Sequence, residues 1–261
     1  MINLYNYILH RFSVVISNIF IFKTVSVYNF LINFSIGKYK YSKYGIKLLN
    51  QDNFENTYKF CLGAAYGYYY SNYLKKIKKK FIFLDIGANI GLYSCLASKN
   101  NNCKFIYAFE PIKKINNIAK KNFILNNVNG NALGKGIYKK NTIKHIYFNP
   151  SHTGMSSLLK KNNKNFKNKI ACKFINYKKL NKVLTNRSIN YLVKIDVEGL
   201  EIIVVKELIK SKMFNFVSSI FIEISNPKDL KFLKNKLKKL KFNLVGPFDK
   251  QFTKDYLFIR Q

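Results

Sequence analysis

Residues 81–91 are Phe81-Ile82-Phe83-Leu84-Asp85-Ile86-Gly87-Ala88-Asn89-Ile90-Gly91, and the segment from Gly91 to Ser98 has the composition of a helix. Four apolar residues ended by an acid and by glycines are typical of a buried parallel strand that runs into a tight turn. Gly87 and Gly91 let the backbone approach a ligand closely, and a helix that starts here points its N-terminus at that ligand. The sequence therefore predicts a strand, a binding loop and a helix, in this order.

Strand and helix patterns continue to alternate through the rest of the chain. The expected strands are Phe105–Phe109, Val128–Leu133, Tyr191–Ile195, Val217–Ile224, Phe242–Val245 and Tyr256–Ile259, and the expected helices are Pro111–Asn126, Leu200–Lys210 and Lys228–Leu240. This alternation predicts an α/β fold with a mostly parallel, seven-stranded sheet and helices on both faces. Ligands bind such sheets beyond the carboxyl ends of the strands, near the point where strand order reverses. Residues 134–175 show no regular period, and their glycines and proline predict hairpins and a loop over the site.

Residues 1–80 are predicted to form a helical N-terminal extension, and residues 81–261 the main domain. The segment 12–36 is apolar, but Lys, Ser and Asn interrupt it, so it falls short of a clean membrane-spanning helix. We expect one or two helices that pack on the main domain. The alternative is a segment that lies on a membrane as a peripheral contact. Since Met1 to His10 lacks the basic start of a signal peptide, we expect a cytoplasmic protein, free or peripheral to the inner face of the membrane.

The formal net charge of +34 admits two interpretations. One is a nucleic-acid binder, because a strongly basic surface attracts phosphate without regard to sequence. The other is a compositional bias, since Lys, Asn, Ile, Phe and Tyr are abundant throughout. The even spread of Lys favours the bias, and so does the scarcity of Arg, the usual reader of guanine edges, which occurs only at Arg11, Arg187 and Arg260. We expect no specific nucleic-acid partner, although the charge can assist binding to an acidic glycan or an anionic membrane.

The cysteines and histidines show no pattern of a disulfide framework or a metal site. The four cysteines are Cys61, Cys95, Cys103 and Cys172, and none of them forms a CxxC pair. This spacing is typical of reduced thiols in a cytosolic protein. The three histidines, His10, His145 and His152, are scattered along the chain. We therefore do not expect a histidine-ligated metal.

The acid before the glycine loop indicates which ligand the loop binds. A dinucleotide site has the pattern GxGxxG, with bare backbone facing a pyrophosphate. Here Asn89 takes the place of the second glycine, and Asp85 adds a negative charge that opposes a pyrophosphate. The sulfonium and α-amino groups of S-adenosylmethionine fit this loop better, which disfavours a nicotinamide-dependent oxidoreductase. We therefore assign Asp85, Gly87, Asn89 and Gly91 to the binding of S-adenosylmethionine.

Glu110 is a second carboxylate at the end of a strand. It follows Asp85 at a spacing close to the roughly 20 residues that separate the loop from the ribose-binding acid in dinucleotide folds. A carboxylate in this place can accept hydrogen bonds from both ribose hydroxyls. An acid favoured by the dipole at a helix N-terminus is the alternative. Together with Asp85 and the glycine loop, Glu110 is better explained as a ribose-binding residue.

Three carboxylates gather after the strand Tyr191–Ile195, in Lys194-Ile195-Asp196-Val197-Glu198-Gly199-Leu200-Glu201. Methyl transfer to a hydroxyl needs a base, and Asp196 or Glu198 can serve as the catalytic base. The same two residues can instead hold a divalent cation, Mg²⁺ or Mn²⁺, that acidifies the hydroxyl. Helix capping accounts for Glu201 but not for Asp196, which is expected on the strand. Glu223, at the end of another strand, is a weaker candidate.

Together these segments resemble the motif series of the FkbM family of methyltransferases. The matching segments, in the order that the family has, are Asp85–Gly91, Phe109–Pro111, Asn131–Gly134 and Lys194–Glu201, with Gly154–Leu158 similar to the Ser-rich segment before the last motif. The resemblance covers about residues 81–225. It implies a Rossmann-like class I methyltransferase fold, S-adenosylmethionine as the methyl donor and, usually, O-methylation of sugars or other hydroxylated natural products, as in polysaccharide biosynthesis. It also implies that Ala132 lies near the adenine.

Two rival functions are weighed against a glycan O-methyltransferase. Base N-methylation of RNA or DNA commonly uses an Asn/Asp-Pro-Pro-aromatic loop, where this chain has Asp196-Val197-Glu198-Gly199. An acid-rich loop suits activation of a hydroxyl better than stacking of a flipped base. A non-catalytic basic binding module on the same fold is the other rival, since fold alone does not prove activity. We therefore expect an O-methyltransferase acting on a sugar, a glycan or a similar hydroxylated metabolite.

Overall fold

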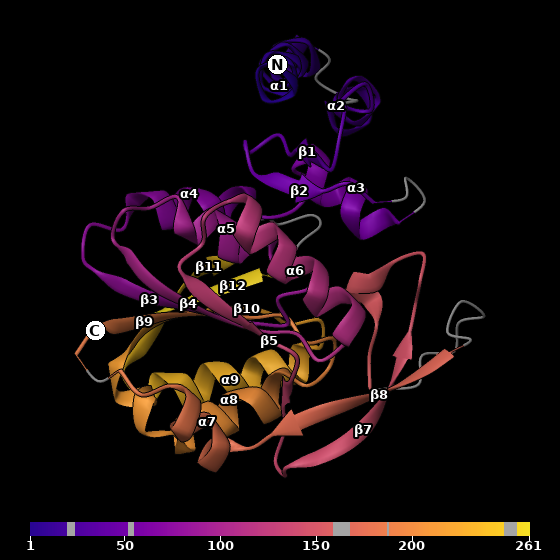
Figure 1. Cartoon of the computed structure of the whole chain (residues 1–261). Helices are drawn as coiled ribbons and strands as arrows, with labels where there is room; N and C mark the ends of the chain where they lie inside the picture. The colour runs from indigo at the N-terminus through magenta and orange to yellow at the C-terminus, as the bar shows by residue number, and fades with distance from the viewer. Residues whose placement is uncertain (20–23, 52–54, 159–167, 187, 248–254) are drawn as a thin grey trace.

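The computed structural model describes residues 1–19, 24–51, 55–158, 168–186, 188–247 and 255–261. Its centre is a seven-stranded sheet in the order β11-β12-β10-β9-β3-β4-β5 (Figure 1). The strands are β3 (Phe81–Ile86), β4 (Cys103–Phe109), β5 (Gly130–Leu133), β9 (Asn190–Ile195), β10 (Val217–Glu223), β11 (Phe242–Pro247) and β12 (Asp255–Arg260). Those from β10 to β5 run parallel, and β12 is antiparallel to both its neighbours. The predicted α/β class I methyltransferase fold, with a mostly parallel sheet, is confirmed.

β3 lies in the middle of the sheet, between β4 and β9, and all its side chains are buried. A strand with neighbours on both edges and helices on both faces has no side that meets water, which explains its apolar run. Asp85 is the charged exception, with a side chain that is 0% exposed. From β3 the chain moves outward to β4 and β5 and then returns to β9 on the other side. The loops after β3, β4 and β9 therefore meet at one edge of the sheet.

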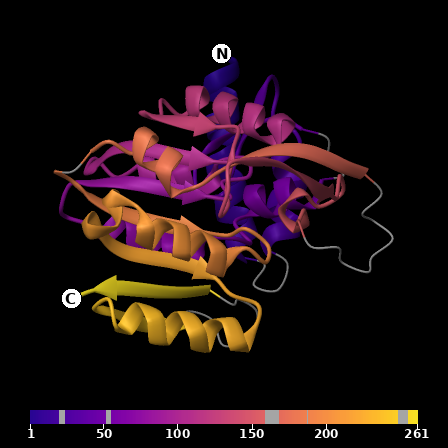
Figure 2. The same cartoon turned by 90° about the horizontal axis from the view of Figure 1, so that it is seen from below.

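Helices cover both faces of the sheet, as predicted. On one face lie α4 (Tyr68–Lys76), α5 (Leu92–Ser98) and α6 (Lys113–Leu125), and on the other α7 (Tyr177–Val183), α8 (Glu201–Lys210) and α9 (Pro227–Lys238) (Figure 1). α9 turns Leu233 and Leu237 inward, and most of its lysines remain at the surface. In Figure 2, α9 and β12 lie at the same edge of the sheet. The amphipathic period of each helix thus selects the side that faces the sheet.

A second, three-stranded sheet in the order β6-β8-β7 is inserted between β5 and β9. Its strands are β6 (Gly136–Ile137), β7 (Thr142–Phe148) and β8 (Asn168–Ile175), and the short helix η1 (Thr153–Met155) follows β7. β7 and β8 pair antiparallel. The expected hairpin is present in the described part of the insertion, whereas 159–167 lie outside the described residues.

The N-terminal extension contains a hairpin besides its helices. The helices are α1 (Ile2–Ile19), α2 (Thr24–Ile32) and α3 (Asn56–Gly63), and between α2 and α3 lie the antiparallel strands β1 (Tyr39–Tyr41) and β2 (Lys47–Leu49). The predicted N-terminal helices are present, whereas the hairpin was not predicted, because strands of this length are too short to show alternation. α1 and α2 pack on each other, on β1 and on α3, which separate them from the main sheet (Figure 1). None of the helices in the described ranges has the length and hydropathy of a membrane span.

Candidate active site

The loop after β3 is locked against the loop after β9. Gly87 has a φ of 78°, and a Cβ atom built on it would lie 1.7 Å from the carbonyl oxygen of Asp196. Only glycine fits there, since any side chain would overlap this backbone. The backbone N–H of Asp196 in turn donates a hydrogen bond of 2.9 Å to the carbonyl oxygen of Ile86. Gly91, with a φ of 83°, is the N-cap of α5. The glycine loop is thus shaped by contact with the acidic loop as well as by its own turn.

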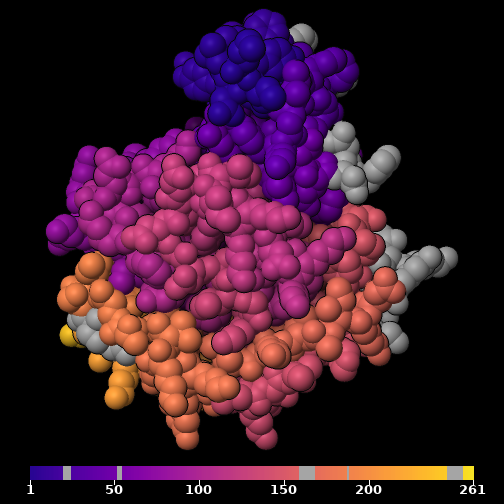
Figure 3. Space-filling view, viewed as in Figure 1, coloured from indigo at the N-terminus to yellow at the C-terminus, as the bar shows by residue number. Residues whose placement is uncertain are grey.

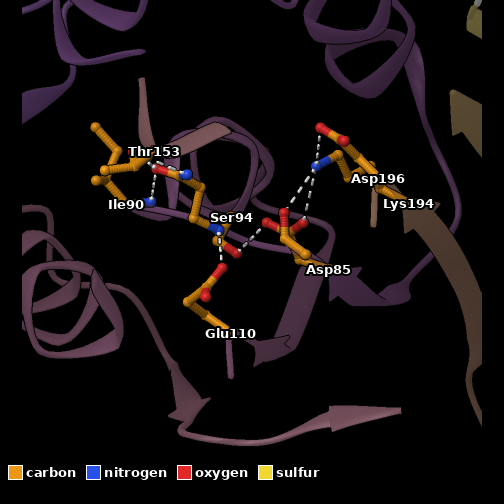
Figure 4. A network of polar contacts seen from close by, with 9 residues as sticks. Asp85, Ile90, Ser94, Glu110, Thr153, Lys194 and Asp196 are labelled. Atoms are coloured by element: carbon orange, nitrogen blue, oxygen red, sulfur yellow. Dashed lines mark hydrogen bonds and ion pairs between the residues drawn. The ribbon is translucent and has the colours of Figure 1, made fainter. Parts of the chain in front are cut away.

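Glu110 directly follows β4 and points its carboxylate at the glycine loop (Figure 4). Its Oε2 accepts a hydrogen bond of 3.0 Å from the backbone N–H of Asn89, and its Oε1 accepts one of 2.9 Å from that of Ile112. Burial raises the pKa of Glu110 to about 7, although these two backbone donors oppose the rise. Each carboxylate oxygen has a further lone pair, so Glu110 can still accept hydrogen bonds from a ligand.

A cavity beside Glu110 lies between the glycine loop and the three-stranded sheet, and we call it the Glu110 cavity. It is lined by Ile86, Gly87, Asn89, Phe109, Glu110, Pro111, Ile112, Gly136, Ile137, Ile146, Thr153, Gly154, Ser156, Ser157, Leu158, Phe174, Asp196, Val197, Glu198 and Leu200. Apolar side chains of the small sheet and of β4 face polar groups of the loops across it. Such a mixture suits a ligand with a flat apolar ring and a few hydroxyl groups.

A larger cavity, of about 390 Å³, adjoins the first, and we call it the tyrosine cavity. Its lining includes Tyr66, Tyr68, Tyr69, Tyr70, Tyr93, the cation Lys194 and the acids Asp196, Glu198, Glu223 and Asp255. The residues that line both cavities, and so form the wall between them, are Asn89, Gly154, Asp196 and Glu198. A ligand that extends from one cavity to the other would pass this wall.

The tyrosine cavity is acidic in a strongly basic protein. Of the 12 acidic residues in a chain of net charge +34, four line it. Glu223 and Asp255 lie opposite each other in the pairing of β10 with β12. The charge of Asp196, followed by burial, raises the pKa of Glu223 to about 8. Burial, followed by the charge of Asp196, raises the pKa of Asp255 to about 6. At neutral pH Glu223 is therefore mostly protonated and the facing Asp255 mostly ionised.

Lys194, in β9, is a buried cation that connects the acids with the glycine loop (Figure 4). Its Nζ lies 3.1 Å from Oδ2 of Asp196 and 3.7 Å from Oδ1 of Asp85. The same Nζ donates a hydrogen bond of 3.1 Å to the carbonyl oxygen of Gly87 and lies 4.8 Å from the ring centre of Tyr93. Burial lowers the pKa of Lys194, but the two aspartates together hold it above its ordinary value. Lys194 thus fixes the carboxylate of Asp196 relative to the glycine loop.

The residues predicted to bind the cofactor fall into two groups. Those that line a cavity are Gly87, Asn89 and Glu110, and those that line neither are Asp85, Gly91 and Ala132. Asp85 lies behind the loop, where its Oδ2 accepts a hydrogen bond of 2.7 Å from the hydroxyl of Ser94. Burial raises the pKa of Asp85, and the nearby Lys194 opposes this. Ala132 is buried within β5. Direct cofactor contact stays a prediction for all six, and the structure gives Asp85 a position that supports the loop from behind.

Asp196 and Glu198, the predicted catalytic residues, are both in the wall between the two cavities. The side chain of Asp196 is 34% exposed, so a ligand can reach it. Glu201 instead accepts a hydrogen bond of 2.8 Å from the backbone N–H of Gly199, which agrees with its predicted capping role. Within the described ranges, no three His, Cys, Asp or Glu side chains are grouped as metal ligands.

Sequence reasoning missed part of this site. Lys194 stands inside the quoted acidic motif, but a lysine in a lysine-rich chain gives no signal of its own. Asp255 begins β12, and because β12 is antiparallel, its first residue lies beside the carboxyl end of β10. The direction of the last strand would have been the signal for it. The dense tyrosines at 66–70 are visible in the sequence, but only their packing shows that they face the acids.

Comparison with known families agrees with this geometry. The family model described as the methyltransferase FkbM domain matches residues 85–244, which include the glycine loop, Glu110 and the acidic loop. The chain belongs to the FkbM family of methyltransferases. As an FkbM protein it is an S-adenosylmethionine-dependent methyltransferase.

Solved structures similar to this FkbM protein are distant. The human methyltransferase 10 domain containing protein is 14% identical, with a TM-score of 0.44, covering 73% of this chain and 79% of that chain. Precorrin-6y C5,15-methyltransferase from Geobacter metallireducens is 9% identical, with a TM-score of 0.41, covering 74% and 87%. TrmK from M. capricolum, in complex with S-adenosyl-homocysteine, is 13% identical, with a TM-score of 0.40, covering 73% and 66%. No curated protein is significantly similar in sequence. The strand order described above, and not these likenesses, defines the fold.

Proposed function

We propose that this FkbM methyltransferase transfers a methyl group to a hydroxyl of a sugar, a glycan or a similar hydroxylated metabolite. The observation that carries the proposal is the place of Asp196 and Glu198 in the wall between the two cavities. An alcohol is a poor nucleophile while it keeps its proton, so transfer to it needs an acceptor for that proton. A carboxylate where donor and acceptor meet can take this proton and can hold the hydroxyl in line with the methyl group.

The Glu110 cavity supports the binding of the adenosine part of S-adenosylmethionine. Glu110 would accept hydrogen bonds from the ribose hydroxyls, while Phe109, Ile137 and Phe174 would cover the adenine ring. Asn89, in the wall, would hold the part of the cofactor that reaches toward the tyrosine cavity. When bound, the cofactor supplies an electrophilic methyl group on its sulfonium.

The tyrosine cavity supports an acceptor rich in hydroxyl groups. Tyr70 is buried and stacked on Phe221, but the exposed Tyr68 and Tyr69 offer rings on which the C–H faces of a sugar can pack and phenols that can donate or accept a hydrogen bond. Asp196 accepts hydrogen bonds, whereas Glu223, protonated at neutral pH, can also donate one. A hydroxyl group both donates and accepts hydrogen bonds. An acceptor beside a donor therefore suits a hydroxyl better than a group that can only donate or only accept. Lys194 holds Asp196 in place through its hydrogen bond.

Three further parts of the proposal concern a cation, nucleic acid and the cellular compartment. Asp196 and Glu198 are the carboxylates that would hold Mg²⁺ or Mn²⁺ if the acceptor hydroxyl were activated by a cation. The even distribution of Lys supports the absence of a specific nucleic-acid partner. All four cysteines are free thiols, in keeping with a reducing compartment such as the cytoplasm.

The proposed reaction can be tested with S-adenosylmethionine labelled in its methyl group. The purified protein is offered nucleotide sugars, extracted surface glycan and total RNA as separate acceptors, and products are examined by mass spectrometry and NMR. We expect O-methyl groups on a sugar, lost in Asp196→Asn and retained in Asp229→Asn, a matched control at a residue of α9 that lines neither cavity. Label on RNA or on nitrogen would contradict the proposal. Loss of activity on chelation, restored by Mg²⁺ or Mn²⁺, would assign the two acids to a metal.

A further inference from the structure

The surface of α1 is the reverse of that of a helix exposed to water. Its buried side chains are all polar, namely Asn6, His10, Ser13 and Ser17. Large apolar side chains are exposed instead, among them Leu4 at 63%, Ile8 at 57%, Phe12 at 54%, Val15 at 62% and Ile19 at 67%. At 3.6 residues per turn, these five form one stripe along the helix, opposite the buried polar face. We call them the α1 stripe.

Hydrogen bonds hold α1 in this orientation. The side chain of Asn6 donates a bond of 2.7 Å to the carbonyl oxygen of Ile36 and accepts one of 3.0 Å from its backbone N–H. Nδ1 of His10 and the hydroxyl of Tyr28 share a buried hydrogen bond of 2.9 Å. Rotation of α1 to bury its apolar side would break these bonds and would expose their partners. The stripe is therefore a fixed part of the surface.

The apolar surface continues beyond α1 onto the end of α2. Phe30, Phe34 and Ile36 are 66%, 57% and 53% exposed, and the rings of Phe30 and Phe34 lie 5.8 Å apart. The hydroxyl of Tyr5, on α1, donates a bond of 3.3 Å to the carbonyl oxygen of Phe34, so the two surfaces adjoin. We call the α1 stripe together with Phe30, Phe34 and Ile36 the apolar platform. It belongs to the part of the molecule that projects farthest from the sheet (Figures 1 and 3).

Charge indicates what covers the apolar platform. Residues 1–51 contain no Asp or Glu, and the basic residues that the structure leaves exposed or half-buried there are Arg11, Lys38, Lys43 and Lys47. Two copies meeting through this segment would bring like charges together, in chains that each carry a net charge of +34. An anionic bilayer complements both features, since an interfacial helix combines an apolar face with basic residues. We propose that the apolar platform rests on an anionic phospholipid bilayer, with α1 lying in the plane of the interface.

Co-sedimentation of the full chain with vesicles tests the proposal. The vesicles are phosphatidylcholine alone or phosphatidylcholine mixed with phosphatidylglycerol. We expect the mixed vesicles to bind the wild type, and Ile8→Glu/Ile19→Glu to bind them at least about tenfold more weakly. The matched control is Ile124→Glu/Ile143→Glu, which adds the same charge at apolar residues that are 76% and 61% exposed elsewhere. Absence of wild-type binding, or equal losses in both double variants, would overturn the proposal, because equal losses indicate attraction by charge alone.

A fluorescence measurement gives a second, independent readout. The sequence has no Trp, so Phe12→Trp adds a single reporter on the α1 stripe, and Phe232→Trp adds one on α9, where the native side chain is 40% exposed. We expect a blue shift on vesicles and quenching by brominated lipid for Phe12→Trp only. Equal responses from the two reporters would overturn the proposal. Light scattering in the absence of lipid gives a further check. A dimer of the wild type that Ile8→Glu/Ile19→Glu abolishes would also overturn the proposal, since it would assign the platform to a second copy.

Discussion

Replacement of Glu110 by Gln should weaken the binding of S-adenosylhomocysteine and remove most of its pH dependence. Both carboxylate oxygens already accept backbone hydrogen bonds, from Asn89 and Ile112. An amide can accept only one of them, and its NH₂ group must then face the other N–H. This internal loss lowers the stability of the loop rather than the affinity. The affinity falls because the amide carries no charge for the ribose hydroxyls, and the loss of a charge-assisted hydrogen bond costs about 1.5–3 kcal/mol, or roughly 10- to 150-fold.

The pH dependence follows from the pKa of Glu110, which burial raises to about 7. The ionised carboxylate is the better acceptor for ribose hydroxyls, so affinity should be highest above this pKa and should fall as pH decreases through it. Between pH 8 and pH 6 the ionised fraction falls from about nine-tenths to about one-tenth, which limits the loss to about tenfold. The stability of the fold changes in the opposite sense. Because the pKa is raised on folding, the contribution of Glu110 is present below about 4.5 and is lost as pH rises through about 7.

Isothermal titration calorimetry at pH 6, 7 and 8 checks both effects, with Asp229→Asn as a variant that also loses one carboxylate, away from the cavities. The reasoning fails if Glu110→Gln binds S-adenosylhomocysteine as tightly as the wild type. A wild-type affinity that is constant across this range would refute the assigned titration, even if the variant were weak.

Other changes separate the roles of backbone, charge and catalysis. Gly87→Ala should destabilise the fold by about 3 kcal/mol or more in chemical denaturation, because its Cβ would overlap a backbone oxygen at 1.7 Å. Gly134→Ala, the control, should stay near wild type, and equal stabilities of the two variants would disprove the overlap. Glu223→Gln should raise the melting temperature more at pH 8 than at pH 5. The contribution of Glu223 to the stability of the wild-type fold is present below about pH 4.5 and is lost as pH rises through its folded pKa of about 8. An identical shift in melting temperature at both pH values would count against this. Asp196→Asn should lower turnover by about 10²- to 10⁴-fold with donor affinity nearly unchanged, and Asp85→Asn should weaken donor binding; kinetics and calorimetry that show the reverse would exclude these roles. Gel-shift measurements should find weak RNA binding that falls steeply with salt, and one RNA retained at high salt would argue for a specific partner.

The sheet could be predicted from sequence because burial leaves a direct trace in residue type. Each residue of β3 lies between two strands and two layers of helices, so its apolar run is visible without knowledge of its neighbours. Gly87 is similar, because the backbone of the acidic loop leaves room for no other residue, and this shows as a glycine at a fixed distance from Asp85. Local pattern and tertiary contact require the same residues here, which is why the glycine loop could be placed after the central strand from the sequence.

The tyrosine cavity could not be predicted from sequence, because it depends on contacts between distant segments. The ring of Tyr70 stacks on that of Phe221, with centres 4.0 Å apart, and this contact brings the N-terminal tyrosines to the carboxyl end of β10. No local period contains such a pairing. The orientation of α1 is a related case. Periodicity shows that Leu4, Ile8 and Phe12 share a face, but the inward side depends on polar partners in the hairpin and its flanks. The structure exposes the apolar face and buries the polar one.

The two cavities are lined by different parts of the chain. All residues that line the Glu110 cavity lie between 86 and 200, whereas the tyrosine cavity takes one wall from residues 57–70. Thr57 also accepts a hydrogen bond of 2.9 Å from the backbone N–H of Gly154, which lines both cavities, whereas residues 65–70 line the tyrosine cavity alone. If the cavities hold donor and acceptor as proposed, exchange of residues 65–70 between two members of the family would change acceptor preference and leave the Glu110 cavity unchanged. In that case this short segment is the variable part of the site, and the methyltransferase domain is its constant part.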